Sequence, residues 1–323
     1  STIAIIPWNI YMFYGDHKLL ADCYENIRRY VDYVDRTSPT GLTSWGRGDW
    51  VPVKSHSSKE LTSSVYFYVD TKILANAAKM FNKTEDYKYY SALANKIKNA
   101  INDKFLNRET GIYGSGVQTE QSVPLQWGIV PEELKRKVAR NLAKQVEAAG
   151  FHLDVGVLGA KAILNALSEN GEAETAYKLA AQDTYPSWGC WIANGATTLL
   201  ENWDLNATRD ISDNHMMFGE IGGWFYKGLG GIFPDPENPG FKHILLRPNF
   251  PSGLNEFEAR YQSPYGEICS KWERKKNRIF YHVTVPANST ATFYAPDNVK
   301  GERAVNLEAG EHILELLLLR SSK

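Results

Sequence analysis

The chain has 323 residues, enough for one large domain or for a large and a small one. Its 36 Lys and Arg nearly balance its 37 Asp and Glu, so it offers no basic surface for nucleic acid or anionic membrane. Its three cysteines lack metal-ligand spacing and no run of 18 apolar residues occurs, so neither a structural metal site nor a membrane span is expected.

Apolar residues recur at helical spacing along the chain as far as Leu229. Short turns separate these segments, and Asp154 is expected to cap the helix that begins next to it. The predicted helices span residues 2–14, 18–34, 60–81, 84–105, 118–129, 131–150, 155–167, 172–181, 193–200 and 215–229. Such a succession closes into a bundle, a solenoid or a double-layered α/α toroid. No fixed-period repeat supports a solenoid. The long loops at 44–57 and 203–214 favour the toroid.

The composition changes after Gly231, where the Pro-rich segment FPDPENPGF begins. Short alternating runs follow at residues 243–247, 256–261, 267–273, 278–285, 290–294 and 312–318, with turn residues between them. They predict an antiparallel β-sandwich. We therefore expect a helical domain at 1–233 and a β domain at 234–323. The last run, HILELLLL, is expected to be buried on both faces or to pack against the helical domain.

The helix predicted at 193–200 runs directly into Glu201, which Trp203 and Asp204 follow, and a polar loop then leads to His215. Carboxylates at the end of a helix oppose its dipole, so a role other than helix stability is indicated. One interpretation is that Glu201 activates water, with Asp204 or His215 binding substrate or tuning its acidity. The alternative is a solvated helix end with Trp203 in the core.

A second loop, SWGRGDWVP, contains Asp49 and Trp50 beside two glycines that permit tight turns. Here Asp49 can bind a sugar hydroxyl next to the stacking face of Trp50. The alternative is a turn aspartate and a tryptophan that covers a helix hairpin. The same choice applies to Trp188, which either lines a cleft near Glu201 or fills the core, because aromatic rings suit both uses.

Seven segments resemble, in the same order, parts of the inverting α-L-rhamnosidases of glycoside hydrolase family 78. A single match of this kind is weak, but an ordered series through almost the whole chain is specific. The segments are IIPWNIYMFYGD at 5–16, GDW at 48–50, HLDVGVLGA at 152–160, TYPSW at 184–188, TTLLENWD at 197–204, NH at 214–215 and SPYGEICSKW at 263–272.

The resemblance implies a mainly α protein, an (α/α)6 six-hairpin toroid followed by an antiparallel β-sandwich. It implies inverting hydrolysis of terminal α-L-rhamnosides in plant or microbial glycosides and polysaccharides, without a cofactor or metal. Glu201 is implied as the general base, and Asp49, Trp50 and His215 as residues that hold the rhamnose ring. Trp188, Trp203 and Asp204, which lie near Glu201 in the sequence, complete the predicted substrate-binding set.

The chain also departs from the family pattern. The family's general acid lies in an Arg-Asp-Glu-Arg-like loop, and this segment is absent. We expect it upstream of Ser1, which makes this an N-terminally truncated toroid with ten helices instead of twelve. The missing N-terminal part of the protein is then a required partner, and the 323-residue chain alone is expected to be nearly inactive. The loop between Asp204 and His215 is also shorter than the family's.

Two other functions remain open from the sequence. One is a toroid glycosidase that acts on another deoxy or uronic sugar, and the other is a non-catalytic carbohydrate-binding relative. All three take a carbohydrate as partner. The sequence does not fix the compartment, although a periplasmic or secreted location is favoured over a cytoplasmic one.

Overall fold

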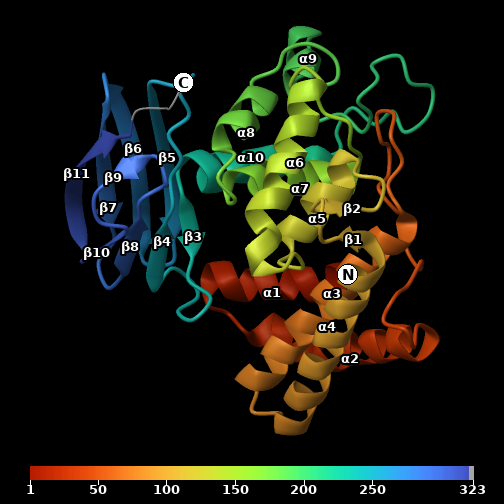
Figure 1. Ribbon diagram of the computed structural model, residues 1–323. Coiled ribbons are helices and arrows are strands. Elements are labelled where there is room, and N and C mark those ends of the chain that lie inside the picture. The colour runs from red at the N-terminus through yellow and green to blue at the C-terminus, as the bar shows by residue number, and fades with distance from the viewer. Residues whose placement is uncertain (320–323) are drawn as a thin grey trace. The chain divides into compact units, whose positions relative to one another are not determined.

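The computed structural model describes residues 1–319 (Figure 1). Two compact units are present, one of Ser1–Trp8 with Lys18–Ile221 and one of Asn9–His17 with Gly222–Lys323. Residues 222–233, which we assigned to the helical domain, therefore group with the β unit. Within the described range, no helix is both long and apolar enough to cross a membrane.

The first unit is built mainly from helices, with one two-stranded hairpin of β1 (Leu106–Asn107) and β2 (Ile112–Tyr113). Its helices are α2 (Lys18–Thr37), α3 (Lys59–Met80), α4 (Thr84–Phe105), α5 (Gln118–Gln126), η1 (Glu132–Leu134), α6 (Lys135–Ala148), α7 (Val157–Ser168), α8 (Ala173–Ala180), α9 (Trp188–Ala193) and η2 (Met216–Phe218). Helix α1 (Thr2–Tyr14) begins in this unit, and its residues from Asn9 onward belong to the second unit. A short helix, α10 (Glu220–Trp224), crosses into the second unit and continues as the π-helical turn η3 (Phe225–Leu229).

Burial separates these helices into two layers. Most residues of α3, α5 and α7 are buried on all sides. In contrast, α2, α4 and α6 bury one apolar stripe and expose the opposite face. The buried helices contact one another in the order α3, α5, α7, and each also packs against an outer helix. This is the double-layered architecture expected of a six-hairpin toroid, with an inner layer enclosed by protein and an outer layer that faces solvent on one side.

The helix predicted at 193–200 is wrong. The structure has α9 at Trp188–Ala193, where Ser187 caps the N-terminus by accepting from the amide of Cys190 at 3.0 Å. The helix stops because Gly195 adopts φ +88°, the left-handed conformation that terminates helices. Glu201 therefore lies in a loop, and the argument from the helix dipole does not apply to it. The helix predicted at 215–229 is likewise interrupted, since it divides into η2, α10 and η3.

Asp70 on α3 is a carboxylate with no exposed surface. One oxygen accepts from the Ser1 hydroxyl at 2.7 Å and lies 3.8 Å from the chain's terminal amine. Burial raises the pKa of Asp70 from its ordinary 3.8 to about 6, although the terminal amine and Ser1 oppose the shift. The folded chain thus holds the Asp70 proton more tightly than the unfolded chain does.

This shift predicts a pH-dependent stability for the Ser1–Lys323 chain. Because the folded pKa is the higher one, the contribution of Asp70 falls as pH rises from about 4 to about 6, by about 3 kcal/mol. Denaturant unfolding at several pH values should show that Asp70→Asn gains stability relative to the parent chain across this window. A pH-independent difference between the two chains would contradict the prediction.

The second unit contains two packed sheets. Its strands are β3 (Ile232–Pro234), β4 (His243–Leu246), β5 (Glu256–Ser263), β6 (Gly266–Lys275), β7 (Arg278–Val285), β8 (Thr290–Tyr294), β9 (Val299–Lys300), β10 (Ala304–Leu307) and β11 (Gly310–Leu318). One sheet has the order β10-β8-β4-β3 and the other β5-β6-β7-β11-β9. Their inner faces share a core that includes Trp272, Tyr281 and Phe293. The sandwich is antiparallel except for the parallel pair β4–β8.

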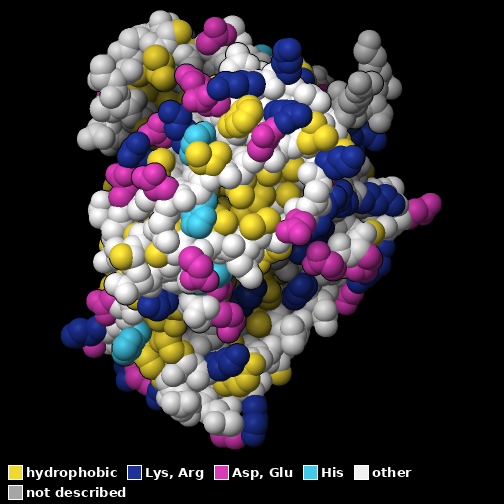
Figure 2. Space-filling view, turned by 90° about the vertical axis from the view of Figure 1, so that its left-hand side faces the viewer, with side chains coloured by type: hydrophobic (Ala, Val, Ile, Leu, Met, Phe, Trp, Pro, Cys, Tyr) yellow, Lys and Arg dark blue, Asp and Glu magenta, His cyan; other side chains and the backbone are white. Residues whose placement is uncertain are grey.

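The expectation that the last strand is buried on both faces is wrong. Residues of β11 alternate between partly buried and exposed, and Ile313 is 67% exposed. Figure 2 views the molecule from the side where β11 lies in Figure 1, and shows hydrophobic side chains at the surface among charged ones. The alternation arises because successive side chains of a strand point to opposite faces, and only one face of β11 meets the core.

Candidate active site

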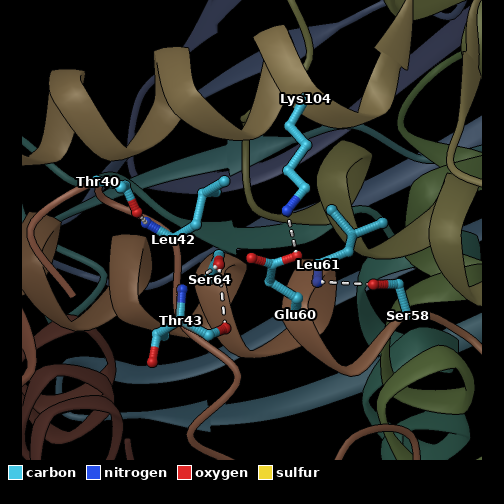
Figure 3. A network of polar contacts seen from close by, with 8 residues as sticks. All are labelled: Thr40, Leu42, Thr43, Ser58, Glu60, Leu61, Ser64 and Lys104. Atoms are coloured by element: carbon cyan, nitrogen blue, oxygen red, sulfur yellow. Dashed lines mark hydrogen bonds and ion pairs between the residues drawn. The ribbon is translucent and has the colours of Figure 1, made fainter. Parts of the chain in front are cut away.

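The loop that contains Asp49 and Trp50 is anchored on α3 at both ends (Figure 3). Before the loop, the amide of Thr43 donates to the Ser64 hydroxyl at 2.9 Å, and that hydroxyl donates back to the Thr43 carbonyl at 3.3 Å. After the loop, the Ser58 side chain caps α3 by accepting from the amide of Leu61. The loop connects α2 to α3, and these contacts fix both its first part and its last residue against α3, so its tip is positioned by the rigid inner layer.

The Asp49 carboxylate accepts four hydrogen bonds from other groups of the protein. One carboxylate oxygen accepts from the amides of Leu158 at 2.7 Å and Gly159 at 3.2 Å. The other accepts from the amide of Gly156 at 2.8 Å and the hydroxyl of Thr119 at 2.5 Å. Burial raises the pKa of Asp49 above its ordinary value, and these four donors only partly oppose that rise. Asp49 therefore caps the N-terminus of α7 from more than 100 residues away in the sequence.

Asp154 was expected to cap α7, and this expectation is wrong. Its carboxylate accepts instead from the amides of Lys54 and Ser55 at 2.9 and 3.0 Å, and from the Ser55 hydroxyl at 2.6 Å. The two aspartates thus bind in opposite directions. Asp49, from the loop, accepts from amides at the start of α7, and Asp154, from the segment before α7, accepts from amides of the loop. Each one fastens the loop to this segment.

Trp50 follows Asp49 and presents its ring to solvent, with 40% of its surface exposed. Its carbonyl accepts from the amide of Val157 at 2.9 Å, and the guanidinium of Arg47 lies 5.7 Å from the ring centroid. The close approach requires glycine at 156, because a Cβ there would lie 2.2 Å from the Trp50 carbonyl oxygen. The backbone of Trp50 is fixed while its ring stays accessible, as a stacking residue requires.

Glu201 lies in a loop whose two arms are joined by hydrogen bonds. Its amide donates to the Ser212 carbonyl at 3.0 Å, and the Ser212 amide donates to Glu201 Oε2 at 3.1 Å. A second contact joins the same two arms, because the amide of His215 donates to the Leu199 carbonyl at 2.8 Å. This pairing brings two residues that are 14 positions apart next to each other.

The pairing places His215 Nε2 3.8 Å from Glu201 Oε1. The other ring nitrogen, Nδ1, accepts from the amide of Met217 at 3.3 Å. A neutral histidine that accepts at Nδ1 carries its proton on Nε2, so an N–H faces the glutamate. The Glu201 side chain is 18% exposed, and no described residue donates a hydrogen bond to Oε1, so a water or a hydroxyl can reach this oxygen.

Trp188 and Trp203 are buried, with 4% and 1% of their surfaces exposed. Trp203 stacks on Trp191 with ring centroids 4.8 Å apart and also contacts Phe218. Its indole N–H donates to the Val155 carbonyl at 2.8 Å. The faces that a sugar would need are covered by other rings, so the geometry favours the core role that the sequence left open.

Asp204 is exposed and turns back on its own loop, accepting from the amide of Asn206 at 2.9 Å. The structure therefore brings Glu201 and His215 together directly. It does not join Asp204 to them through any described hydrogen bond or ion pair.

Sequence reasoning missed the importance of residues 155–157. Val155 accepts from the Trp203 indole, Gly156 donates to Asp49, and Val157 donates to the Trp50 carbonyl. This short segment ties the Trp50 loop to the loop that carries Glu201. Its sequence signal was the glycine in DVGVL, directly before an apolar helix.

A second missed group lies between the inner helices. Tyr66 packs edge-to-face on Trp127 at 5.8 Å. Burial raises the pKa of Tyr66, and the charges of Asp49 and Glu220 raise it further. Glu220 Oε1 in turn accepts from the side-chain Nδ2 of Asn165 at 2.8 Å. No motif marks these residues, because they come from four separate segments that only the fold brings together.

The role of Trp203 can be tested through stability. Trp203→Phe keeps an aromatic ring but leaves the buried Val155 carbonyl without its donor, which costs about 1–3 kcal/mol. We expect chemical denaturation to report a loss of this size. Trp45→Phe, at a tryptophan that is 60% exposed, is the matched control and should change stability little. Equal losses in both variants would show that the indole bond is unimportant.

Comparison with known proteins assigns the two units. The family model of the bacterial alpha-L-rhamnosidase 6 hairpin glycosidase domain matches residues 1–229. The family model of the bacterial alpha-L-rhamnosidase C-terminal domain matches residues 231–310. An alpha-L-rhamnosidase of Formosa agariphila is 30% identical over 99% of this chain and 36% of its own length. One from Streptomyces avermitilis is 28% identical over 90% of this chain and 28% of its own length.

Solved structures agree with these matches. The alpha-L-rhamnosidase from Dictyoglumus thermophilum superposes with a TM-score of 0.88 at 32% identity, covering 97% of this chain and 39% of that one. The Streptomyces avermitilis alpha-L-rhamnosidase complexed with L-rhamnose gives 0.84 at 28% identity, covering 98% and 32%. The chain thus spans between about a quarter and two fifths of the length of these relatives. It belongs to the bacterial α-L-rhamnosidases of glycoside hydrolase family 78, with a six-hairpin glycosidase domain and the family's C-terminal domain.

Proposed function

We propose that the protein containing this chain hydrolyses terminal α-L-rhamnosides with inversion of configuration, and that Glu201 is the general base. The observation that carries the proposal is the pairing of Glu201 with His215 in a loop fastened at both arms. The family membership and the relative solved with L-rhamnose support the choice of sugar.

The geometry suits water activation. The Ser212 amide holds Glu201 Oε2, which fixes the carboxylate and leaves Oε1 to accept a proton from water. The Nε2–H of His215 faces the same oxygen from 3.8 Å, a separation too long for a direct hydrogen bond. A water or a sugar hydroxyl placed between them can bond to both. In an inverting enzyme this water attacks from the face opposite the leaving group.

The roles of the other predicted residues follow from their surroundings. The exposed Trp50 ring is the proposed stacking surface for the apolar face of the sugar. Asp49 is proposed to hold Trp50 and α7 in place, since all its contacts are to the protein. Trp188 and Trp203 are proposed to support the Glu201 loop as buried core residues. Asp204, which is exposed, remains a proposed substrate contact.

A direct test combines a substrate panel with product analysis. The full-length protein should hydrolyse an aryl α-L-rhamnoside in preference to aryl glycosides of other deoxy sugars and of uronic acids. Proton NMR recorded early in the reaction should show β-L-rhamnose first. First-formed α-L-rhamnose would contradict inversion. Turnover of another glycoside alone would identify that sugar as the substrate. Binding of rhamnosides without turnover would show that the protein is a non-catalytic carbohydrate-binding protein.

The isolated 323-residue chain is expected to be nearly inactive. Inversion needs a second carboxyl group about 6.5–9.5 Å from the base to protonate the leaving oxygen, and we propose that this acid lies upstream of Ser1. Loss of such a group lowers the rate by about 10²–10⁴-fold. The measurement compares kcat of the chain and of the full-length protein on a substrate with a poor leaving group. Equal rates would place the acid within these residues.

A further inference from the structure

The second unit contains a pocket, lined mostly by residues of polar type, that shares no residue with the candidate active site. Its volume is about 430 Å³, within the range of about 300–1,000 Å³ found for small-molecule sites. Three turns form it, those before β4, between β7 and β8, and between β10 and β11. Its lining includes the side chains of Asn238, Lys242, His243, Asn288, Thr290 and Glu308.

Two of the three turns that form the pocket are joined by hydrogen bonds. Lys242 Nζ donates to the Asn288 carbonyl at 2.8 Å, which joins the first turn to the second. Asn288 adopts φ +63°, a conformation that asparagine tolerates better than most residues. The adjacent Ser289 is buried, and its hydroxyl donates to the Phe241 carbonyl at 2.9 Å. These two turns are therefore fixed relative to each other, and a ligand need not order that part of the pocket.

The charge and hydrogen-bonding groups of the pocket define the ligand. The Lys242 ammonium and the Glu308 carboxylate offset each other, so neither anions nor cations are favoured overall. The ring nitrogens of His243 contact the hydroxyls of Thr290 at 2.7 Å and Thr292 at 3.0 Å. This histidine is thus committed to the sheet and is not open to a metal ion.

What remains is a mixture of donors and acceptors on short side chains. Asn238 uses its amide nitrogen on Asp235 at 2.8 Å, which leaves its amide oxygen as an acceptor. The Asn288 side chain offers both functions, and Glu308 is an exposed acceptor. Beside the pocket, Lys242 Nζ lies over the ring of Tyr265, 5.3 Å from its centroid. Neutral, polyhydroxylated molecules match this combination.

We infer that this pocket is an accessory carbohydrate-binding site that takes one or two neutral sugar units. The pocket would give the protein a second glycan contact besides the proposed active site. Binding at the pocket does not depend on the proposed hydrolysis, because it needs no catalytic group. On a polymeric substrate, two linked contacts raise the effective affinity beyond that of either one alone.

Histidine NMR tests the inference at the site itself. The chain has 7 histidines, so the ring Cε1–H signals of His243 and His215 can be assigned with His243→Gln and His215→Gln. Titration with L-rhamnose and with a neutral rhamnosyl disaccharide, up to about 50 mM for a weak site, should shift the His243 signal and saturate it. Glu308→Leu and Lys242→Met should each weaken this effect by about tenfold or more.

The outcomes separate this inference from the proposed function, because His215 reports the Glu201 loop and His243 reports the pocket. A shift at His215 alone would overturn the inference and leave the proposed function standing. A His243 shift caused equally by phosphate or galacturonate would also overturn it, since the pocket would then bind anions. Unchanged signals of the other histidines in both variants establish that the β unit remains folded.

Discussion

Glu201→Gln is expected to lower kcat of the full-length protein on an aryl α-L-rhamnoside by about 10²–10⁴-fold, with a small change in KM. The amide keeps the size and the contact with the Ser212 amide, but it cannot take a proton from water. The loss therefore falls on the chemical step. Initial rates over a range of substrate concentrations measure it.

Two controls make this result specific to general-base catalysis. Asp204→Asn changes the neighbouring acid of the same loop, which is exposed and bonded to Asn206, and should lower kcat less than about tenfold. Glu201→Ala opens space beside the sugar, so added azide should restore turnover and yield the β-L-rhamnosyl azide. If Asp204→Asn loses as much activity as Glu201→Gln, or if azide has no effect, the base lies elsewhere.

Asp49→Ala is expected to lower the free energy of unfolding by about 2–3 kcal/mol and to raise KM more than it lowers kcat. The stability loss arises because three amides at the start of α7 and the Thr119 hydroxyl lose their acceptor. The rise in KM follows because the capped segment also holds the backbone of Trp50 through Val157. Thermal or chemical denaturation and steady-state kinetics measure the two effects.

Milder variants distinguish this positioning role from direct sugar binding. Thr119→Val removes one of the four bonds to Asp49 and should give a fraction of both effects. Asp49→Asn retains an oxygen that can accept from the α7 amides and should recover most of the stability and of the KM. If Asp49 instead bound a sugar hydroxyl, Asp49→Asn would lose activity at nearly unchanged stability.

The sequence predicted most of the elements because their apolar spacing is local. Helices such as α3 and α6 and strands such as β6 and β7 follow from residues that lie next to one another along the chain. The pairing of helices into layers and the existence of a β domain followed from these elements. The seven ordered motifs then identified the family, which the comparisons confirm.

Local signals failed where another segment competed with them. The TTLLE run has helical composition, yet Gly195 ends the helix early and the loop arms pair with each other instead. Asp154 lies shortly before α7 and could cap it, but Asp49 from a distant loop accepts from the α7 amides instead. Asp154 then binds the amides of that loop. A strand such as β11 alternates at the surface because nothing covers its outer face in the described unit.

By itself the sequence determined the fold class, the two-part organisation and the identity of Glu201, Trp50 and His215 as candidates, because residue type and order carry that information. Only the tertiary structure decided which of the candidates stand open and which are buried. Trp203 and Trp188 are packed against other rings, Asp49 is bound by α7, and Glu201 meets His215. These outcomes depend on hydrogen bonds between segments up to 110 residues apart, which no local pattern encodes.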